Sequence, residues 1–231
     1  MALDFLLLQR YPEATAARFR HYRWRQPAFT FGYSQKIDFV RSTIEGSGPN
    51  LLNSTTTLAR GAYDLCRRPT GGGIVDHRHD WTYALVVPRG HPLEAERAAE
   101  SYRAVHACLV EALRAQGVEA VLQRPHEGQG GADGLCFQRA EVHDVIRAAT
   151  GEKIAGAAQK RNKRGLLLQG SIWRPAAAGD VDWEKFEEAF AGRLAAMLGL
   201  AAERTPWPEL DEDEISGLTE KYSSPEWLES R

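Results

Sequence analysis

The chain has 231 residues, 43% of them hydrophobic, and a formal net charge of −2, which suits one large domain with a substantial core. The near balance of 29 Lys and Arg against 31 Asp and Glu gives no overall steering toward nucleic acid. The three cysteines form no Cys-x-x-Cys pair, which argues against a disulfide framework and favours a reducing cytoplasm. No apolar run is long enough to span a bilayer and residues 1–8 lack the features of a secretion signal, so we expect a cytoplasmic protein with no membrane partner.

The first elements predicted are an amphipathic helix and a strand. Residues 2–24 carry Leu and Tyr side chains at helical spacing, with a break at Pro12 and a continuation over residues 14–22. Residues 24–35 place aromatic side chains on one face and predict a strand. Residues 40–64 are rich in Gly, Ser, Thr and Asn and predict a loop.

A strand, a helix and a short strand are expected next. The apolar run at residues 81–88 predicts a buried strand. Pro92 opens a helix that Gly117 closes, and Cys108 within it is expected to be a small core residue. Residues 118–123 predict a short strand.

The last third of the chain predicts a hairpin, a strand and a helix. Residues 142–146 and 153–159 flank a Thr-Gly-Glu turn and predict the hairpin, and residues 166–173 predict the strand. Asp182 is a suitable N-cap for a helix that finishes at Gly199.

The tail, residues 203–231, is rich in Pro, acidic residues and Trp and predicts a short helix followed by an extended end. Strands and helices come in mixed order and no repeat is visible, which favours an α+β domain with a mixed β-sheet over a doubly wound fold. We expect residues 1–231 to form a single domain.

A triple glycine is the most informative stretch. The candidate binding residues in and around it are Arg67, Arg68, Thr70, Gly71, Gly72, Gly73 and His77. Consecutive glycines lose much backbone entropy in a strand or helix, so a ligand that lies close to the backbone is the usual reason for them. Their main-chain N–H groups can face a carbonyl, a carboxylate or a phosphate. The alternative is a surface turn, which would not need the flanking Arg and His residues.

The triple glycine fits neither nucleotide signature. No Gly-Lys-Ser/Thr follows it, and the dinucleotide pattern Gly-x-Gly-x-x-Gly is missing. His77, His79 and Asp80 lack a third metal ligand at helical or hairpin spacing, so we expect no metal site.

Cys136 differs from the other cysteines because it follows a Gly-rich segment and precedes many Lys and Arg residues. A cationic neighbourhood lowers the pKa of a thiol and raises the thiolate fraction that a nucleophile needs. From the local sequence, a catalytic nucleophile and a half-buried structural cysteine are equally compatible with this position.

Lys153 stands where the hairpin turn enters a strand of small residues that includes Gly156 and Ala157. The small side chains leave room for the ammonium group to meet a ligand carbonyl or phosphate. The alternative is an exposed turn lysine. The basic cluster at residues 160–164 is either a solvated turn or a docking patch for an acidic protein or a phosphate-bearing arm.

Several motifs, taken in order, resemble the lipoate-protein ligase A and octanoyltransferase family. They are the triple-glycine stretch at residues 67–77, Lys-Ile-Ala-Gly-Ala-Ala-Gln-Lys-Arg at 153–161 and Leu-Gln-Gly-Ser-Ile at 168–172. The opening residues 1–4 and the segment Lys-Tyr-Ser-Ser-Pro-Glu-Trp at 221–227 agree. The resemblance covers most of the chain and implies a mixed-sheet catalytic domain of the biotin/lipoate ligase type, without a C-terminal accessory domain. It also implies that the glycine stretch and the lysine strand wall an acyl tunnel.

The resemblance implies attachment of an octanoyl or lipoyl group to a lysine of a lipoyl carrier domain. Such domains belong to 2-oxoacid dehydrogenases and to the glycine cleavage H protein. The position of Cys136 ahead of Asp144 and Lys153 is closest to the cysteine-type octanoyltransferases, which take the acyl group from acyl carrier protein through a thioester and need no cofactor. In that case Cys136 and Lys153 would be catalytic, and Gly156 and Ala157 would bind the substrate.

Three alternatives share the resemblance. An ATP-dependent lipoate ligase would use ATP and Mg²⁺ to make a lipoyl-adenylate from lipoate. A lipoyl amidotransferase would move acyl groups between carrier proteins by the same thiol chemistry. A non-catalytic module would bind the acyl group or the carrier protein without transferring anything.

Overall fold

The computed structural model describes residues 1–10, 16–46, 63–125, 140–177 and 179–230. In these ranges an antiparallel sheet with the strand order β1-β5-β9-β8-β7-β6 forms the centre of the molecule. Its strands are β1 (Arg18–Tyr22), β5 (Asp80–Pro88), β6 (Ala120–Leu122), β7 (Val145–Arg147), β8 (Lys153–Asn162) and β9 (Gly165–Trp173). A smaller sheet has the order β3-β2-β4 and is made of β2 (Ala28–Phe31), β3 (Asp64–Arg67) and β4 (Ile74–Asp76).

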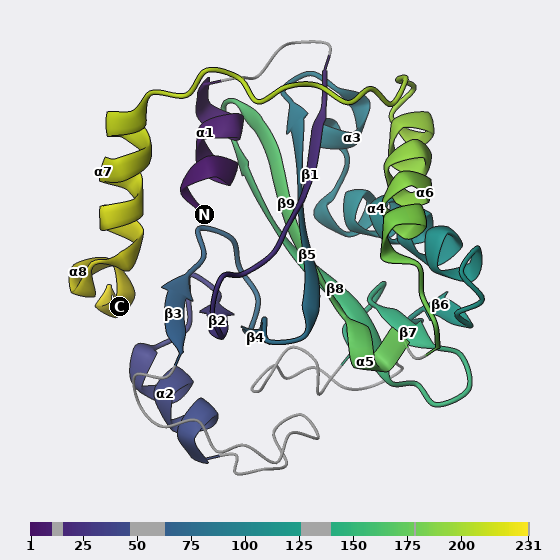
Figure 1. Cartoon of the computed structure of the whole chain (residues 1–231), viewed down its shortest axis with the longest axis horizontal. Helices are drawn as coiled ribbons and strands as arrows, with labels where there is room; N and C mark the ends of the chain where they lie inside the picture. The colour runs from purple at the N-terminus through teal and green to yellow at the C-terminus, as the bar shows by residue number, and fades with distance from the viewer. Residues whose placement is uncertain (11–15, 47–62, 126–139, 178, 231) are drawn as a thin grey trace.

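Helices cover both faces of the large sheet (Figure 1). The long helices α4 (Ala98–Arg114) and α6 (Trp183–Met197) pack on one face, where alternate β5 residues such as Trp81 and Tyr83 join the main core. The intervening β5 residues Ala84 and Val86 pack on the other face against Leu7 of α1 (Ala2–Arg10). Because successive strand residues point to opposite faces, β5 is buried on both sides and reads as a continuous apolar run.

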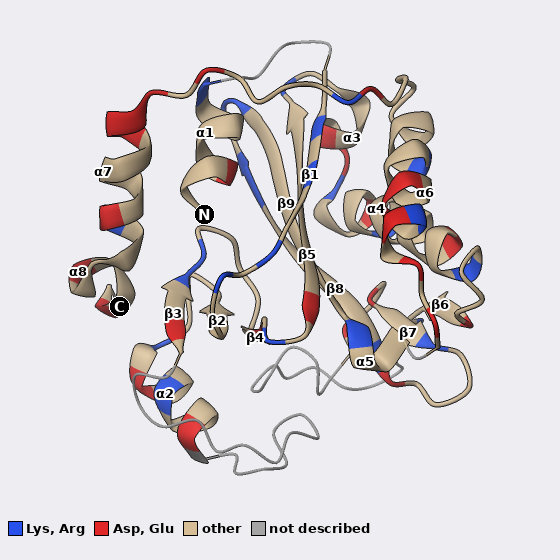
Figure 2. Cartoon of the chain, viewed as in Figure 1, with Lys and Arg blue, Asp and Glu red and all other residues tan. Residues whose placement is uncertain are grey.

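The remaining helices are α2 (Ile37–Gly46), α3 (Pro92–Ala95), α5 (Arg174–Ala177), α7 (Glu212–Ser223) and α8 (Pro225–Glu229). Acidic and basic residues are interspersed on α2 and α6 rather than separated onto different faces (Figure 2). No helix of the described ranges is both long enough and apolar enough to cross a bilayer.

The predicted α+β class with a mixed sheet is confirmed, since β2 pairs parallel with β3 and antiparallel with β4. The strands expected at residues 81–88, 118–123 and 166–173 and the hairpin are present, with β7 beginning only at Val145. The helix expected after Asp182 is also present, and the Asp182 side chain accepts a hydrogen bond from the Lys185 backbone N–H.

Three predictions for the first half of the chain were wrong. The helical continuation to Tyr22 is replaced by β1, whose pairing with β5 over the register Arg18↔Val86 outweighs the local helical pattern. The strand expected over residues 24–35 is confined to β2. Residues 40–46 of the expected loop belong to α2, in which Ile37 and Val40 are buried, while residues 47–62 lie outside the described ranges.

Two predicted helices are also divided differently. The helix expected from Pro92 to Gly117 consists of α3 and α4, because the backbone at Glu96 is extended. The tail contains α7 and α8 in place of one short helix with an extended end, and Asp211 and Ser224 supply their N-caps.

Candidate active site

The glycine loop, defined here as residues 68–73, joins β3 to β4 and lies against the large sheet. A Cβ atom built on Gly32 would be 2.0 Å from the Gly72 carbonyl oxygen, so the backbone after β2 and the loop pack directly on each other. The Tyr33 N–H donates to the Thr70 carbonyl at 3.0 Å. On its other side the loop approaches β8, since a Cβ on Gly72 would be 3.6 Å from the Ala158 Cβ. Gly72 has φ 89°, which a residue with a side chain rarely adopts.

Arg68 holds the glycine loop from inside. Its side chain is buried, and Nη2 donates to the Gly71 carbonyl at 3.0 Å and to the Gly73 carbonyl at 2.8 Å. Nη1 donates to Thr30 Oγ1 at 2.7 Å, which connects the loop to β2. The predicted binding residue Arg68 therefore belongs to the frame of the loop.

Arg67 points away from the loop, as expected for neighbouring residues at a strand end. Its buried guanidinium donates to the carbonyls of Tyr33, Gln35 and Leu228. The Trp227 indole N–H donates back to the Arg67 carbonyl at 3.0 Å. Arg67 thus ties the stem of the glycine loop to α8.

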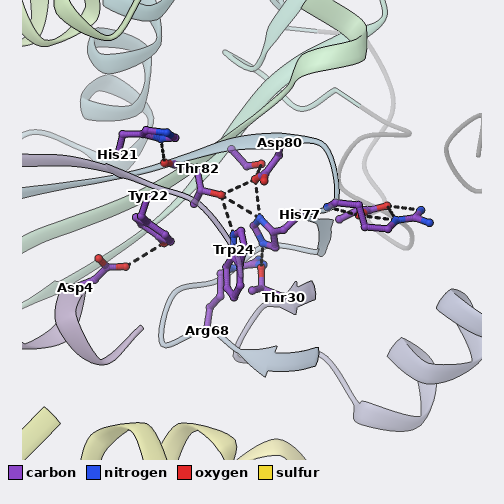
Figure 3. A network of polar contacts seen from close by, with 12 residues as sticks. Asp4, His21, Tyr22, Trp24, Thr30, Arg68, His77, Asp80 and Thr82 are labelled. Carbon is purple, nitrogen blue, oxygen red and sulfur yellow. Dashed lines mark hydrogen bonds and ion pairs between the residues drawn. The ribbon is translucent and has the colours of Figure 1, made fainter. Parts of the chain in front are cut away.

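His77 is the centre of a buried polar network (Figure 3). Its Nε2 lies 2.7 Å from Thr30 Oγ1, the same hydroxyl that Arg68 contacts, and its Nδ1 lies 2.6 Å from Asp80 Oδ2. The Trp24 ring packs on the imidazole with centroids 4.4 Å apart. The predicted residues Arg68 and His77 are therefore connected through Thr30.

Asp80 anchors this network to the large sheet. Its Oδ2 accepts hydrogen bonds from Ser171 Oγ at 2.6 Å and Thr82 Oγ1 at 2.7 Å. Burial acts to raise the pKa of Asp80, but His77 and the donated hydrogen bonds lower it below its ordinary value. Asp80 is therefore a carboxylate that stays ionised at neutral pH.

Thr70 connects the glycine loop to β9 and α1. Its Oγ1 donates to Gln169 Oε1 at 3.0 Å, and Gln169 Nε2 donates to Asp4 Oδ2 at 2.7 Å. Asp4 is fully buried and pairs with Arg20 at 2.9 Å. The loop is therefore fixed to both β2 and β9.

The lysine cluster, defined here as Lys153, Asp144 and Tyr102, lies where β7 and β8 separate. Lys153 is buried, and its Nζ is 2.6 Å from Asp144 Oδ2. The Tyr102 hydroxyl donates to Asp144 Oδ1 and accepts from the Ala157 N–H at 2.9 Å. Burial and the neighbouring Asp144 charge raise the pKa of Tyr102 well above its ordinary value, so the phenol keeps its proton. Lys153 is thus a partnered buried cation and not an exposed turn residue.

The lysine cluster and the glycine loop meet over one face of β8. Gly156 and Ala158 point to the same face because strand side chains alternate. A Cβ on Gly156 would be 2.9 Å from Lys153 Cε, while Ala158 faces Gly72. Ser171, which binds Asp80, is the cross-strand partner of Gly156. The structure therefore brings Lys153, Gly156, the glycine loop and the His77 network together over a floor of small residues.

Two of the predicted site residues, Ala157 and Cys136, do not have side chains that the structure places in the site. The Ala157 side chain packs against the main core, and only its N–H takes part in the site through Tyr102. Cys136 falls within residues 126–139, outside the described ranges, so its catalytic role stays a prediction. Cys66 and Cys108 are free, and burial raises the pKa of both thiols, which makes neither a ready nucleophile. Cys108 packs partly buried against the main core.

Further residues of the site were not singled out from sequence. Tyr102 lies in the helix predicted to begin at Pro92, and its hydroxyl is the signal that could have found it, because a buried phenol needs a polar partner. Thr30 gave no signal within its strand. Among the described residues, His, Cys, Asp and Glu nowhere form a group of three or more able to hold a metal ion. In the basic cluster, Arg161 donates to the Glu94 and Glu96 carbonyls.

Comparisons with known proteins agree with this arrangement. Residues 1–193 match the family model of the lipoyl protein ligase A/B catalytic domain. The octanoyltransferase LipM of Macrococcus caseolyticus is 26% identical over 275 residues, covering 100% of this chain and 94% of that protein. The LipM of Geobacillus kaustophilus is 31% identical over 179 residues, covering 74% of this chain but 59% of that protein.

Solved structures share the fold at low sequence identity. A bipartite lipoate protein ligase from Thermoplasma acidophilum, studied with its E2 lipoyl domain, has a TM-score of 0.69 at 19% identity, with 98% of this chain and 89% of that chain covered. A lipoate-protein ligase A bound with ATP has a TM-score of 0.71 at 19% identity, with 98% and 91% covered. Because the family model matches most of the length of this chain, the chain belongs to the lipoyl protein ligase A/B catalytic domain family.

Proposed function

We propose that this protein transfers an octanoyl group from acyl carrier protein to a lysine of a lipoyl carrier domain, through a thioester on Cys136. The observation that carries the proposal is the position of the glycine loop against the small-residue face of β8, beside Lys153. An aliphatic chain can lie along a backbone without side chains, and its carbonyl end would then be close to an ammonium group. The LipM names of the relatives support the octanoyl group as the cargo.

The charges around this face favour a thioester substrate over ATP. Among the residues that the structure describes, the buried cations beside the floor are Arg68 and Lys153, and the buried carboxylates Asp80 and Asp144 match them in number. Arg68 already donates to two loop carbonyls. A neutral thioester needs no further compensation in such a site, whereas a triphosphate brings several negative charges that need cations or a metal ion. This balance supports the transferase over the adenylating ligase.

The reaction proposed has two steps. The Cys136 thiolate attacks the thioester carbonyl of octanoyl-acyl carrier protein, the carbon–sulfur bond to the carrier breaks, and the carrier sulfur leaves as a thiolate that takes up a proton from water. The amine of the acceptor lysine then attacks the new thioester, the amide forms, and the Cys136 sulfur leaves as the thiolate while the amine gives up a proton. The oxyanion of each tetrahedral intermediate would be stabilised by Lys153 or by N–H groups of the glycine loop.

The acceptor proposed is a lipoyl domain of a 2-oxoacid dehydrogenase or the glycine cleavage H protein. The structural neighbour from Thermoplasma acidophilum was studied together with an E2 lipoyl domain, which supports a carrier of this class. The donor and the acceptor would reach the same thioester in turn, as ping-pong kinetics requires.

Incubation with octanoyl-acyl carrier protein and intact-mass spectrometry test the proposal. We expect a mass increase of one octanoyl group on Cys136, which disappears when a lipoyl domain is added and modified. Cys136→Ala should lose the adduct and transfer, whereas Cys108→Ala should retain both, because Cys108 packs against the core. Modification that requires lipoate and ATP and leaves no adduct would establish the ligase. Transfer that is unchanged in Cys136→Ala would overturn the thioester mechanism.

A further inference from the structure

The Asp144 carboxylate contacts three separate segments of the chain. Oδ2 pairs with Lys153 Nζ at 2.6 Å and accepts from the Glu141 N–H at 2.7 Å, and Oδ1 accepts from the Tyr102 hydroxyl. Its side chain is 1% exposed. Hydrogen bonds to an ionised acceptor are about twice as strong as neutral ones, so these contacts hold the carboxylate and its partners firmly in position.

Gly156 decides where the lysine can lie. A Cβ at this position would be 2.9 Å from Lys153 Cε, 3.0 Å from Nζ and 3.2 Å from Asp144 Oδ1. The end of the lysine side chain and the carboxylate therefore meet beside the space that a side chain at Gly156 would fill. Glycine provides the space, and Asp144 provides the charge that keeps the ammonium group there.

The backbone that carries Asp144 is itself held in an uncommon conformation. His143 has φ 70°, in the left-handed region that residues with side chains rarely adopt. The His143 carbonyl is 2.7 Å from Nδ1 of the fully buried His106. The backbone N–H of His143 donates to the Gln123 carbonyl at 2.9 Å. Such strain persists only where the surroundings fix it, and it is concentrated at functional sites.

We propose that Asp144 is a positioning residue for the transfer reaction, and that it acts by holding the Lys153 ammonium group over Gly156, toward the glycine loop. The proposal rests on the proposed function, since it assigns Lys153 to the stabilisation of the oxyanion. Asp144 does not meet the substrate itself. The Asp144 carboxylate orients the Lys153 ammonium group and compensates the buried charge of that group. Through Tyr102 it also connects the lysine to α4.

A purely structural ion pair would have different consequences. If Asp144 served only the fold, its removal would lower stability and would affect transfer equally with or without Lys153. If Asp144 acts through Lys153, its removal matters only while the lysine is present. Effects of residues that act as a unit are non-additive, so a double-mutant cycle separates the two possibilities.

The first experiment measures kcat and KM for octanoyl transfer in Asp144→Asn, Lys153→Ala and the double variant. Asparagine keeps the shape of the side chain and removes its charge. We expect Asp144→Asn to lower kcat by about 100-fold with KM changed by less than about threefold, as for loss of an interaction made in the transition state. In the Lys153→Ala background the same substitution should lower kcat by less than about twofold. Additive effects on kcat would overturn the proposal.

Asp182→Ala is the control for lost stability. Asp182 caps α6 by accepting a hydrogen bond from the Lys185 N–H at 3.1 Å and pairs with Lys185 Nζ at 3.0 Å, and these contacts involve neither the lysine cluster nor the glycine loop. We expect this variant to lower the melting temperature but to keep kcat within about twofold of the parent. An equal loss of kcat in both variants would show that instability, and not the position of the lysine, limits the reaction.

The second experiment follows the lysine without any transfer assay. Trace labelling with acetic anhydride, read by peptide mass spectrometry, reports how readily the Lys153 amine reacts. Without the carboxylate, the buried ammonium group loses its countercharge and its fixed position, so the amine becomes more accessible to the reagent. We expect Lys153 labelling to increase at least about fivefold in Asp144→Asn and to stay unchanged in Asp182→Ala. Unchanged labelling in Asp144→Asn would overturn the positioning role.

The two readouts separate this proposal from the proposed function. Increased labelling in a protein that transfers no octanoyl group would support the positioning of Lys153 and reject the transferase. Tyr102→Phe serves where Asp144→Asn does not fold, since it removes only the hydroxyl that donates to Oδ1. We expect a drop in kcat of about fivefold and increased labelling in that variant. Parental values for both measurements would contradict the proposal.

Discussion

The glycine loop and the lysine cluster flank the same face of β8, yet they are held in opposite ways. The glycine loop is held through its backbone, since Gly32 packs on the Gly72 carbonyl and Arg68 donates to the carbonyls of Gly71 and Gly73. The lysine cluster is held through side chains, with a carboxylate between an ammonium group and a phenol. The first arrangement fixes the shape of one wall, and the second fixes the position of one charge.

This difference predicts which substitutions damage the fold and which damage only the reaction. A new atom placed against the backbone of the loop has no way to be accommodated, because a carbonyl cannot move without its chain. A new atom placed against the lysine meets the end of a flexible side chain, which can shift slightly within its ion pair at small cost to stability.

Gly32→Ala should have the largest effect. Its Cβ would lie 2.0 Å from the Gly72 carbonyl oxygen, so β2 and the glycine loop would have to separate. We expect a loss of at least about 3 kcal/mol in the free energy of unfolding, measured by urea denaturation. Gly71→Ala is the control, since a Cβ there meets no atom within 4 Å. Equal stability of the two variants would show that the loop is not held by its backbone.

His106 should make the lysine cluster sensitive to acid. Burial lowers its pKa from 6.5 to about 4. Among the described residues, the buried Nε2 has no hydrogen-bond partner that could stabilise a protonated ring. The unfolded chain binds a proton more readily, so this contribution to stability is complete above pH 6.5 and is lost as the pH falls toward 4. The shift corresponds to about 3 kcal/mol.

Comparison with His106→Asn isolates that contribution. Asparagine can still donate to the His143 carbonyl but does not titrate. The variant should therefore lose less stability than the parent between pH 6.5 and 4, as measured by urea denaturation at several pH values. His21, whose pKa burial also lowers, titrates in both proteins and cancels in the difference. Parallel pH curves for parent and variant would refute the assignment.

Arg68→Met should weaken the loop by about 2 kcal/mol, because the loop carbonyls and Thr30 lose a charged donor. The variant should also lose octanoyl transfer more than its stability explains. Arg147→Met is a matched control, since Arg147 of β7 donates to the Ala176 carbonyl of α5, outside the glycine loop. Normal transfer by the Arg68→Met variant, measured at a temperature at which the variant is fully folded, would mean that the guanidinium does not shape the site.

The sequence was sufficient to predict the local parts of this comparison. Three consecutive glycines demand close backbone contact, and the alternation around the Thr-Gly-Glu turn indicates the hairpin that carries Lys153. The wrong helix at β1 shows the limit, because that strand exists only through its pairing with β5, far along the chain. Long-range pairing has no local signature.

The same limit applies to the site. The sequence could not tell which of Arg67 and Arg68 faces the glycine loop, since neighbouring strand residues point to opposite faces and the neighbours decide which face is which. The partners of His77 and Lys153 depend on Thr30, Ser171 and Tyr102, which three other elements bring into place. Asp80 was considered as a metal ligand, whereas its contacts are to His77 and two hydroxyls.

Gly156→Ala should have the smallest effect on the fold and still impair the reaction. The new Cβ would lie 2.9 Å from Lys153 Cε, 3.0 Å from its Nζ and 3.2 Å from Asp144 Oδ1. The end of the lysine side chain can shift by a few tenths of an ångström without moving the backbone or breaking its ion pair with Asp144. We expect kcat to fall about tenfold while the free energy of unfolding changes by less than about 1 kcal/mol. Gly192→Ala in α6, where a Cβ meets no atom within 4 Å, should leave transfer unchanged and raise stability slightly. If Gly156→Ala instead destabilises the protein as strongly as Gly32→Ala, then Lys153 is as rigidly fixed as the glycine loop. The proposed difference, in which the backbone holds the glycine loop and side chains hold the lysine cluster, would then be wrong.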